Sequence, residues 1–365
     1  MKIKIFLLVL FGCLFLTGCG NNNLENVVDN LSKKVNDLKS YTVEGNLEIV
    51  NNDDVFNYRV KVDHQKTDYY KVSLLNVKNN HEQIILKNDD GVYVVTPSLN
   101  KSFKFQSEWP YNNSQVYILD NIVNDITEDS NNKVTEDNGD YVIESTVNFP
   151  NNANLVKQRV TVSNDLVFKR VEILNEDDMP LMTFTIDSVN YKPLFDESYF
   201  EINSIINDTE NNANNSNSNT NTNDPKDKTT NQESGNNENN QAQESNTETR
   251  TSTLDDIIYP LYIPTGTSLT NEEKVSKTDG ERVILTFGGD KSFTLVEETV
   301  NVMDEFTVVP TYGEPFLLVD TMAALTSNSI NWVSNGVEYY IVSDVMNQTE
   351  LIKVAESLVT VDKIK

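Results

Sequence analysis

Near its start the chain carries one amphipathic stretch with apolar residues at helical spacing. The polar positions of this stretch include Asp29, Lys33 and Lys34. The apolar positions recur every three or four residues, which places them on one face of a helix. They are Leu24, Val27, Val28, Leu31, Val35 and Leu38. We expect this helix to pack on a protein core, because its apolar face lacks aromatic residues and its polar face is not strongly basic.

From Tyr41 to Tyr191 the pattern changes to alternation of apolar and polar residues, which is typical of antiparallel strands with one buried face. The segment Asn88-Asp89-Asp90-Gly91 predicts a tight hairpin, because Asp-Gly readily adopts the positive φ that such turns require. A second helical pattern interrupts the strands, and Phe195 to Ile202 forms a closing segment. The helical positions are Val116, Leu119, Ile122, Val123 and Ile126, with Asn112, Asn113 and Ser114 as candidate caps.

The chain then passes through a polar stretch into a second apolar part. Residues 208–252 are dominated by Asn, Ser, Thr, Asp, Glu and Gln. Such a composition cannot bury enough apolar surface to offset the entropy of ordering. We therefore expect a disordered linker over 204–252 between two folded domains, 24–203 and 253–365.

The second domain is predicted to be a small α+β unit. Its apolar residues form short alternating runs, and Asn347 with Glu350 predicts a capping box at the start of a final helix. The expected strands are Arg282 to Phe287, Ser292 to Glu297, Phe306 to Val309, Phe316 to Val319, Ile330 to Val333 and Val337 to Val342. The whole chain is thus expected to be mainly β.

The first 18 residues have the pattern of a signal peptide. Lys2 and Lys4 precede an apolar run that ends at Leu16, which is shorter than the roughly 20 residues of a spanning helix. The sequence Leu16-Thr17-Gly18-Cys19 resembles the lipobox of bacterial lipoproteins. The resemblance implies cleavage before Cys19 and covalent diacylglyceryl and acyl groups on that residue, with no other cofactor. Residues 19–23 then form a short tether, and the protein is expected to be lipid-anchored at the extracytoplasmic face of the plasma membrane.

Charge and residue inventory restrict the chemistry. A net charge of −27 over 365 residues repels nucleic acid and anionic headgroups, so we expect no nucleic-acid partner and membrane attachment through lipid alone. The two cysteines are Cys13 and Cys19, and the two histidines are His64 and His81. Neither a metal site nor a catalytic triad is expected from this inventory. Glu297 and Glu298 are neighbours on a predicted strand and point to opposite faces, so they cannot flank one scissile bond. We expect no catalytic residue and no enzyme.

Three stretches of the first domain resemble the LolA-type, outer-membrane lipoprotein-sorting-like family, here as a lipoprotein of Gram-positive bacteria. They are Leu38 to Thr42, Asn88 to Pro97, and Val171 to Tyr191 with Phe195 and Phe200. The resemblance implies a curved antiparallel half-barrel covered by amphipathic helices, with an apolar cavity that takes acyl chains. The candidate cavity-lining residues are Val43, Leu47, Tyr58, Val60, Val72, Leu119 and Ile122. If the helices pack tightly, the same residues form a filled core, and the sequence leaves both alternatives open.

The second domain resembles a small extracytoplasmic domain found in sporulation lipoproteins and anti-sigma factors. The resemblance rests on Tyr259-Pro260, on the spacing of Trp332, Gly336 and Tyr339, and on the closing Glu350 to Leu358. Two hypotheses follow. In the first, the protein binds lipid or lipoprotein acyl chains in the half-barrel. In the second, it is a tethered interaction module that holds or regulates a cell-envelope protein partner, such as a sporulation, germination or cell-wall enzyme.

Overall fold

The computed structural model describes residues 24, 26–52, 54–66, 68–112, 114–206, 254, 256–278, 280–303 and 305–359. The predicted signal peptide, Cys19, its tether and most of the predicted linker lie outside these residues. No helix in the described ranges is long and apolar enough to cross a membrane.

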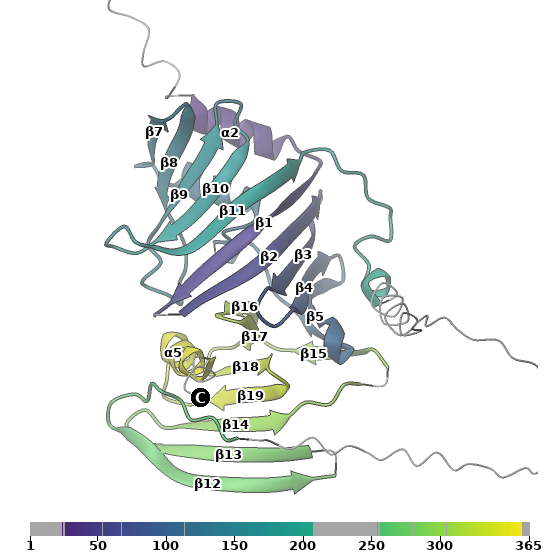
Figure 1. Ribbon diagram of the computed structural model, residues 1–365, viewed down its shortest axis with the longest axis vertical. Coiled ribbons are helices and arrows are strands. Elements are labelled where there is room, and N and C mark those ends of the chain that lie inside the picture. Colours follow the sequence, from purple (N-terminus) through teal and green to yellow (C-terminus); the bar gives the residue numbers. More distant parts are fainter. Residues whose placement is uncertain are drawn as a thin grey trace, which may run out of the picture.

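The described strands form two sheets, which confirms the prediction of a mainly β chain (Figure 1). The larger sheet has 12 strands in the order β15-β6-β5-β4-β3-β2-β1-β11-β10-β9-β8-β7. Its strands are β1 (Ser40–Asn51), β2 (Asp54–Gln65), β3 (Tyr69–Asn76), β4 (His81–Asn88), β5 (Gly91–Thr96), β6 (Lys101–Phe105), β7 (Lys133–Asp137), β8 (Asp140–Thr146), β9 (Lys157–Ser163), β10 (Phe168–Leu174), β11 (Pro180–Asn190) and β15 (Thr307–Thr311).

The smaller sheet has seven strands in the order β12-β13-β14-β19-β18-β17-β16, counted within the described residues. They are β12 (Thr267–Lys277), β13 (Gly280–Gly289), β14 (Phe293–Thr299), β16 (Glu314–Leu318), β17 (Thr321–Leu325), β18 (Ser329–Ser334) and β19 (Val337–Val342). Trp332 lies opposite Tyr339 across the β18–β19 hairpin, and their rings stack at 5.1 Å. The spacing of Trp332, Gly336 and Tyr339 therefore reflects a hairpin with a cross-strand aromatic pair.

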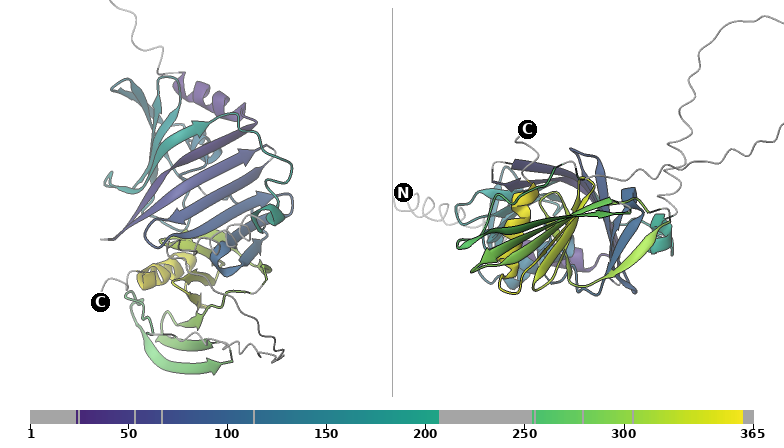
Figure 2. Two further views of the ribbon diagram at one scale, coloured as in Figure 1. Left: turned by 45° about the vertical axis from the view of Figure 1, so that its right-hand side comes forward. Right: turned by 90° about the horizontal axis from the view of Figure 1, so that it is seen from below.

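Two helices cover one face of the larger sheet, α2 (Val27–Asn36) and α3 (Leu119–Glu128) (Figure 2). Leu31 of α2 and Ile122 of α3 belong to the same buried cluster as Val43 and Val60 of the sheet. The second helix begins later than the sequence predicts, because Val116 and Tyr117 lie in the loop before α3. Ser114 does not cap the helix; its hydroxyl accepts a hydrogen bond from the backbone N–H of Asn148.

The other face of β4 and β5 is covered by the closing segment. Phe200 and Ile205 pack there with Ile84 and Tyr93, and Asn88 donates a hydrogen bond to the Phe200 carbonyl at 2.9 Å. Residues 202–206 are helical. The linker was therefore predicted to begin too early, since Ile205 is buried in this cluster.

The predicted hairpin at Asn88–Gly91 is confirmed. Asn88 pairs with Gly91, whose φ is +136°. The capping box is also confirmed at α5 (Gln348–Val359), where Asn347 Oδ1 accepts from the N–H of Glu350 at 2.9 Å. The Glu350 carboxylate in turn accepts from the N–H of Asn347 at 3.1 Å.

The two sheets meet through an extensive junction. β15 was predicted as a strand of the second domain, but it pairs in parallel with β6 and extends the larger sheet. Tyr58 donates from its hydroxyl to the Val319 carbonyl at 2.8 Å. Gln83 of β4 accepts through Oε1 from the N–H of Met322 at 2.6 Å. Strand pairing and buried hydrogen bonds therefore tie the C-terminal part of the chain to the larger sheet.

Candidate ligand-binding site

A pocket with a volume of about 470 Å³ lies at the junction of the two sheets. Three parts of the chain form its walls: the end of the larger sheet with its loops, the β16–β17 region, and α5. Apolar lining residues include Ile49, Trp109, Val116, Phe149, Leu155, Leu181, Met182, Phe316, Leu317, Met322 and Ile352. A cavity of this size with a mainly apolar lining is typical of a small-molecule site.

Helix α5 contributes one of its faces to the cavity. The lining residues Thr349, Ile352, Lys353 and Glu356 follow the spacing i, i+3, i+4 and i+7, which brings them onto one side of a helix. Another side of α5 is buried in the core of the smaller sheet through Leu351, Val354, Ala355 and Leu358. The capping box fixes where α5 begins and therefore helps to fix which side chains reach the cavity.

The wall formed by the larger sheet consists of strand ends and turns. Ile49 to Asn52 come from the end of β1 and the turn after it, and Asn175 to Met182 include lining residues around the β10–β11 turn. Several asparagine side chains here hydrogen-bond within their own turns. Asn175 Oδ1, for example, accepts from the N–H of Met179 at 2.9 Å. These amides hold the loops that support the apolar wall.

Three polar groups in the cavity wall are notable. Asn51 Nδ2 is buried and has no hydrogen-bond partner within the described residues. Burial raises the pKa of the Glu356 carboxyl to about 7, while the nearby Lys353 pulls it down. Among the described residues, none hydrogen-bonds to this carboxyl. Lys353 itself is exposed at the edge of the cavity. Lys353 and Glu356 are therefore available to a ligand.

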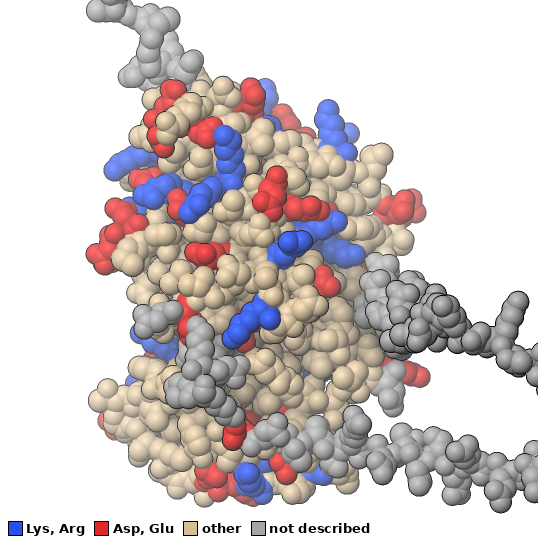
Figure 3. Space-filling model, viewed as in Figure 1, with Lys and Arg blue, Asp and Glu red and all other residues tan. Residues whose placement is uncertain are grey.

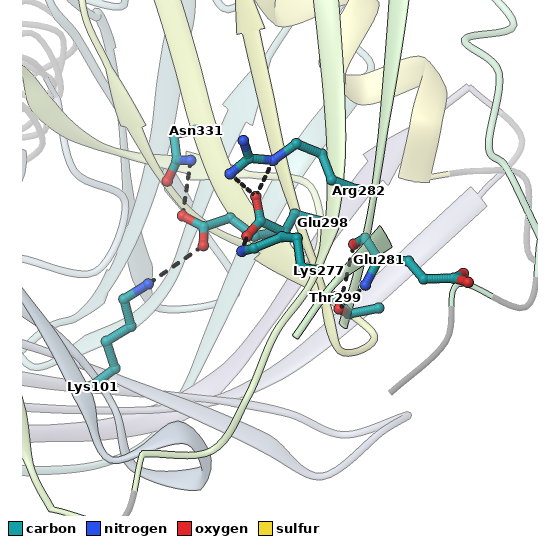
Figure 4. Close-up of polar contacts among 8 residues, drawn as sticks. Lys101, Lys277, Glu281, Arg282, Glu298, Thr299 and Asn331 are labelled. Carbon is teal, nitrogen blue, oxygen red and sulfur yellow. Dashed lines mark hydrogen bonds and ion pairs between the residues drawn. The ribbon is translucent and has the colours of Figure 1, made fainter. Parts of the chain in front are cut away.

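Polar contacts across the junction hold the cavity walls together. Glu314 of β16 accepts hydrogen bonds from Ser107 and, at 2.9 Å, from Asn112 Nδ2. Lys101 of β6 forms an ion pair with Glu338 of β19 at 3.4 Å. Figure 4 shows Lys101 reaching from the larger sheet toward the smaller sheet. The cavity therefore depends on the correct docking of the two sheets.

The seven predicted cavity residues lie elsewhere. Val43, Leu47, Tyr58, Val60, Val72, Leu119 and Ile122 are all buried in the core between the larger sheet and its helices. None of them is among the residues that line the junction cavity. The side chains of α2 and α3 fill the concave face, so this region is a packed core. Among the seven, Tyr58 reaches the junction, where its hydroxyl meets the Val319 carbonyl.

The acidic pair Glu297 and Glu298 has the arrangement expected from strand geometry. Glu297 is fully buried, and its carboxylate accepts from the N–H of Ile258 at 3.1 Å. Glu298 points the other way, toward Lys277 and Arg282 (Figure 4). Within the described ranges no group of three or more His, Cys, Asp or Glu residues could hold a metal ion.

Comparisons with known proteins give one relative along nearly the whole chain. The sporulation protein YdcC of Bacillus subtilis (strain 168) is 31% identical over 359 residues, which is 97% of this chain and 97% of that protein. No family model matches.

The similar solved structures include lipoproteins and lipoprotein-sorting-like proteins. The complex of the CwlD amidase from Clostridioides difficile with the GerS lipoprotein gives 20% identity over 49% of this chain and 100% of that chain, with a TM-score of 0.29. A LolA-superfamily protein from Nitrosomonas europaea gives 12% identity over 48% of this chain and 96% of that chain, with a TM-score of 0.28. The relative along the full length confirms the resemblance to sporulation proteins, and the chain belongs to the family of the Bacillus subtilis sporulation protein YdcC.

Proposed function

We propose that this chain is a lipid-anchored, non-enzymatic envelope protein of sporulation that binds an acyl chain in the junction cavity. The observation that carries the proposal is the mainly apolar cavity of about 470 Å³ between the larger sheet and α5. Each methylene group removed from water there contributes about 0.8 kcal/mol. A chain of several methylene groups in this cavity therefore gains enough to bind without any covalent chemistry.

The location of the cavity differs from that expected for a half-barrel carrier. The concave face is filled by α2 and α3, whereas the junction retains open volume. The proposed anchor at Cys19 lies only five residues before Leu24, where the described chain starts. At about 3.5 Å per residue this tether reaches less than 20 Å, so the larger sheet is expected to stay near the membrane that supplies the ligand.

The test uses the mature chain from residue 19 with Cys19→Ser, which removes the acyl groups of the anchor itself. Native mass spectrometry and displacement of a fluorescent fatty acid measure binding. We expect one acyl ligand per protein. Met182→Trp places a larger side chain in the cavity wall and is expected to weaken binding at least tenfold.

Val77→Trp is the matched control, because Val77 is exposed and does not line the cavity. Thermal melting checks that both variants fold. Unchanged affinity in a folded Met182→Trp protein would place the acyl site elsewhere, and absence of any bound lipid would refute the proposal.

A second candidate function, tethered docking of a protein partner, is favoured by one exposed segment. Leu261, Tyr262 and Ile263 are 60%, 40% and 38% exposed. The prolines on either side of them, Pro260 and Pro264, are buried. We call residues 260–264 the projection. Because the two buried prolines hold its three exposed apolar side chains in place, binding a partner costs little conformational entropy.

Hydrogen bonds fix this projection on the smaller sheet. The N–H of Ile258 donates to the buried Glu297 carboxylate at 3.1 Å, and the Tyr259 hydroxyl donates to Glu272 at 2.7 Å. Because Glu272 and Glu273 lie on the neighbouring β12, the matching partner is a protein with an apolar pocket surrounded by basic residues.

Photo-crosslinking in sporulating cells tests this second function. A crosslinker at Tyr262 is expected to give one protein adduct, while a crosslinker at the exposed Thr270 of β12 is expected to give none. The identified partner, purified, must then bind the protein with an affinity that falls with salt and falls at least tenfold in Leu261→Ser. Lipid adducts alone, or binding unaffected by Leu261→Ser, would refute it.

A further inference from the structure

The polar groups of the junction cavity come from two neighbouring elements. Asn51 lies at the β1–β2 turn, and Lys353 and Glu356 lie on α5. Figures 1 and 2 show the turn of the β1–β2 hairpin close to α5 in two views. Lys353 and Glu356 therefore place an ammonium group and a carboxyl group on one helix of a largely apolar cavity, whereas the Asn51 Nδ2 atom is itself buried.

Near neutral pH Lys353 and Glu356 can both act as hydrogen-bond donors. Lys353 carries an ammonium group, which only donates. Glu356 retains its proton up to about pH 7 because its carboxyl is buried. The other titratable lining residue, Tyr117, is buried, and burial raises the pKa of its hydroxyl, so it also stays protonated.

The chemistry of these two groups is complementary to acceptor oxygens and to negative charge. A carboxylate or phosphate offers several acceptor lone pairs and no N–H donor. A cationic amine offers donors only and carries the same charge as Lys353. The apolar wall does not distinguish these ligands when their acyl chains are equal, so the discrimination has to come from the polar groups.

Building on the proposed acyl-chain binding, we propose that Lys353 and Glu356 select acyl ligands whose head group is an acidic, oxygen-rich acceptor such as a carboxylate or a phosphate. The acyl chain occupies the apolar part between Met182, Leu181 and Phe316, and the head group lies at α5. This selection assigns a ligand class to the cavity and a role to these two residues of α5.

The experiment compares ligands of equal chain length at pH 6 on the mature chain with Cys19→Ser. Hexadecanoic acid, hexadecylamine and hexadecyl phosphate are titrated against a bound fluorescent fatty acid, below their aggregation concentrations. We expect at least one of the two acidic ligands to bind about tenfold more tightly than the amine. Tighter binding of hexadecyl phosphate indicates a ligand with a phospholipid-like head group, and tighter binding of hexadecanoic acid indicates a free fatty acid.

Variants connect this preference to the residues. Lys353→Met is expected to reduce the preference for acidic ligands several-fold, and Glu356→Gln to retain it, because glutamine keeps a donor without charge. Lys274→Met is the matched control, since Lys274 is an exposed lysine of β12 outside the cavity.

The outcomes separate this inference from the function on which it rests. Equal binding of acid, phosphate and amine would overturn the inference while acyl binding stands. Loss of the preference in Lys274→Met to the same extent as in Lys353→Met would also overturn it. Failure of all three ligands to bind would refute the proposed function, and the inference with it.

Discussion

Gln83 offers a direct test of the junction that creates the cavity. Its Oε1 accepts from the N–H of Met322 at 2.6 Å and from the Thr321 hydroxyl at 3.0 Å. Gln83, Thr321 and Met322 are all buried. The substitution Gln83→Leu keeps the approximate volume of the side chain but removes the acceptor for both groups.

The size of the effect follows from what each donor retains. The Thr321 hydroxyl still lies 2.9 Å from the Val333 carbonyl, so it remains satisfied after the change. The Met322 N–H loses its acceptor in a buried position, which costs about 1–3 kcal/mol. We therefore expect the free energy of unfolding to fall by about 2 kcal/mol, a substantial part of the 5–15 kcal/mol typical of folded proteins.

Urea unfolding followed by tryptophan fluorescence measures this loss. Trp109 lies in the cluster of the larger sheet and Trp332 in that of the smaller sheet, so the signal reports on both parts. Gln65→Leu, at the end of β2 and partly exposed, is the matched control and is expected to change stability by less than about 0.5 kcal/mol. A loss in Gln83→Leu no larger than that of the control would show that the Gln83 contacts do not stabilise the junction.

Three further predictions concern pH, backbone packing and helix capping. The folded protein holds the Glu356 proton more tightly than the unfolded chain, so this group's contribution to stability is lost as pH rises from about 4.5 to about 7. Urea midpoints should fall less over this range in Glu356→Gln than in the native protein, and an equal fall would contradict the assignment. Gly45→Ala places a Cβ atom 2.3 Å from the Thr185 carbonyl oxygen and should cost about 3 kcal/mol by urea unfolding. Gly139→Ala, with φ at +86° but no atom within 4 Å, should cost about 1 kcal/mol, and the reverse order would refute the packing argument. Asn347→Ala removes the cap of α5, which should cost about 1 kcal/mol and weaken fatty-acid binding; an unchanged midpoint would contradict the capping role.

The sequence predicts well the features that depend on neighbouring residues. The turn at Asp90-Gly91, the capping box of Asn347 and Glu350, and the hairpin that pairs Trp332 with Tyr339 are all present. Each results from a local conformational preference: positive φ at glycine, side-chain capping of a helix, or pairing across a two-residue turn. These preferences act within about ten residues and leave a readable pattern.

The pairing of β15 with β6 is the opposite case. Phe306 to Val309 has the alternation of a strand, but Val309 lies beside Phe103 in a parallel pair across about 200 residues of chain. Alternation indicates which face of a strand is buried and does not identify its neighbour. The strand was therefore recognised correctly and assigned to the wrong sheet.

The position of the cavity has a similar physical cause. Val60 and Ile122 show the same apolar pattern whether the half-barrel is hollow or filled, because the distance between helix and sheet depends on all the side chains between them. Regular elements can interdigitate along their whole length, as α2 and α3 do with the larger sheet. Turns cannot interdigitate as easily, because their short asparagine side chains are held by hydrogen bonds to the backbone of the same turn. Asn152 Oδ1 accepts from the N–H of Asn154 at 3.1 Å, and Asn175 Oδ1 accepts from the N–H of Asp177 at 3.0 Å. These side chains stay at the wall, so space remains where the turns of the larger sheet face α5.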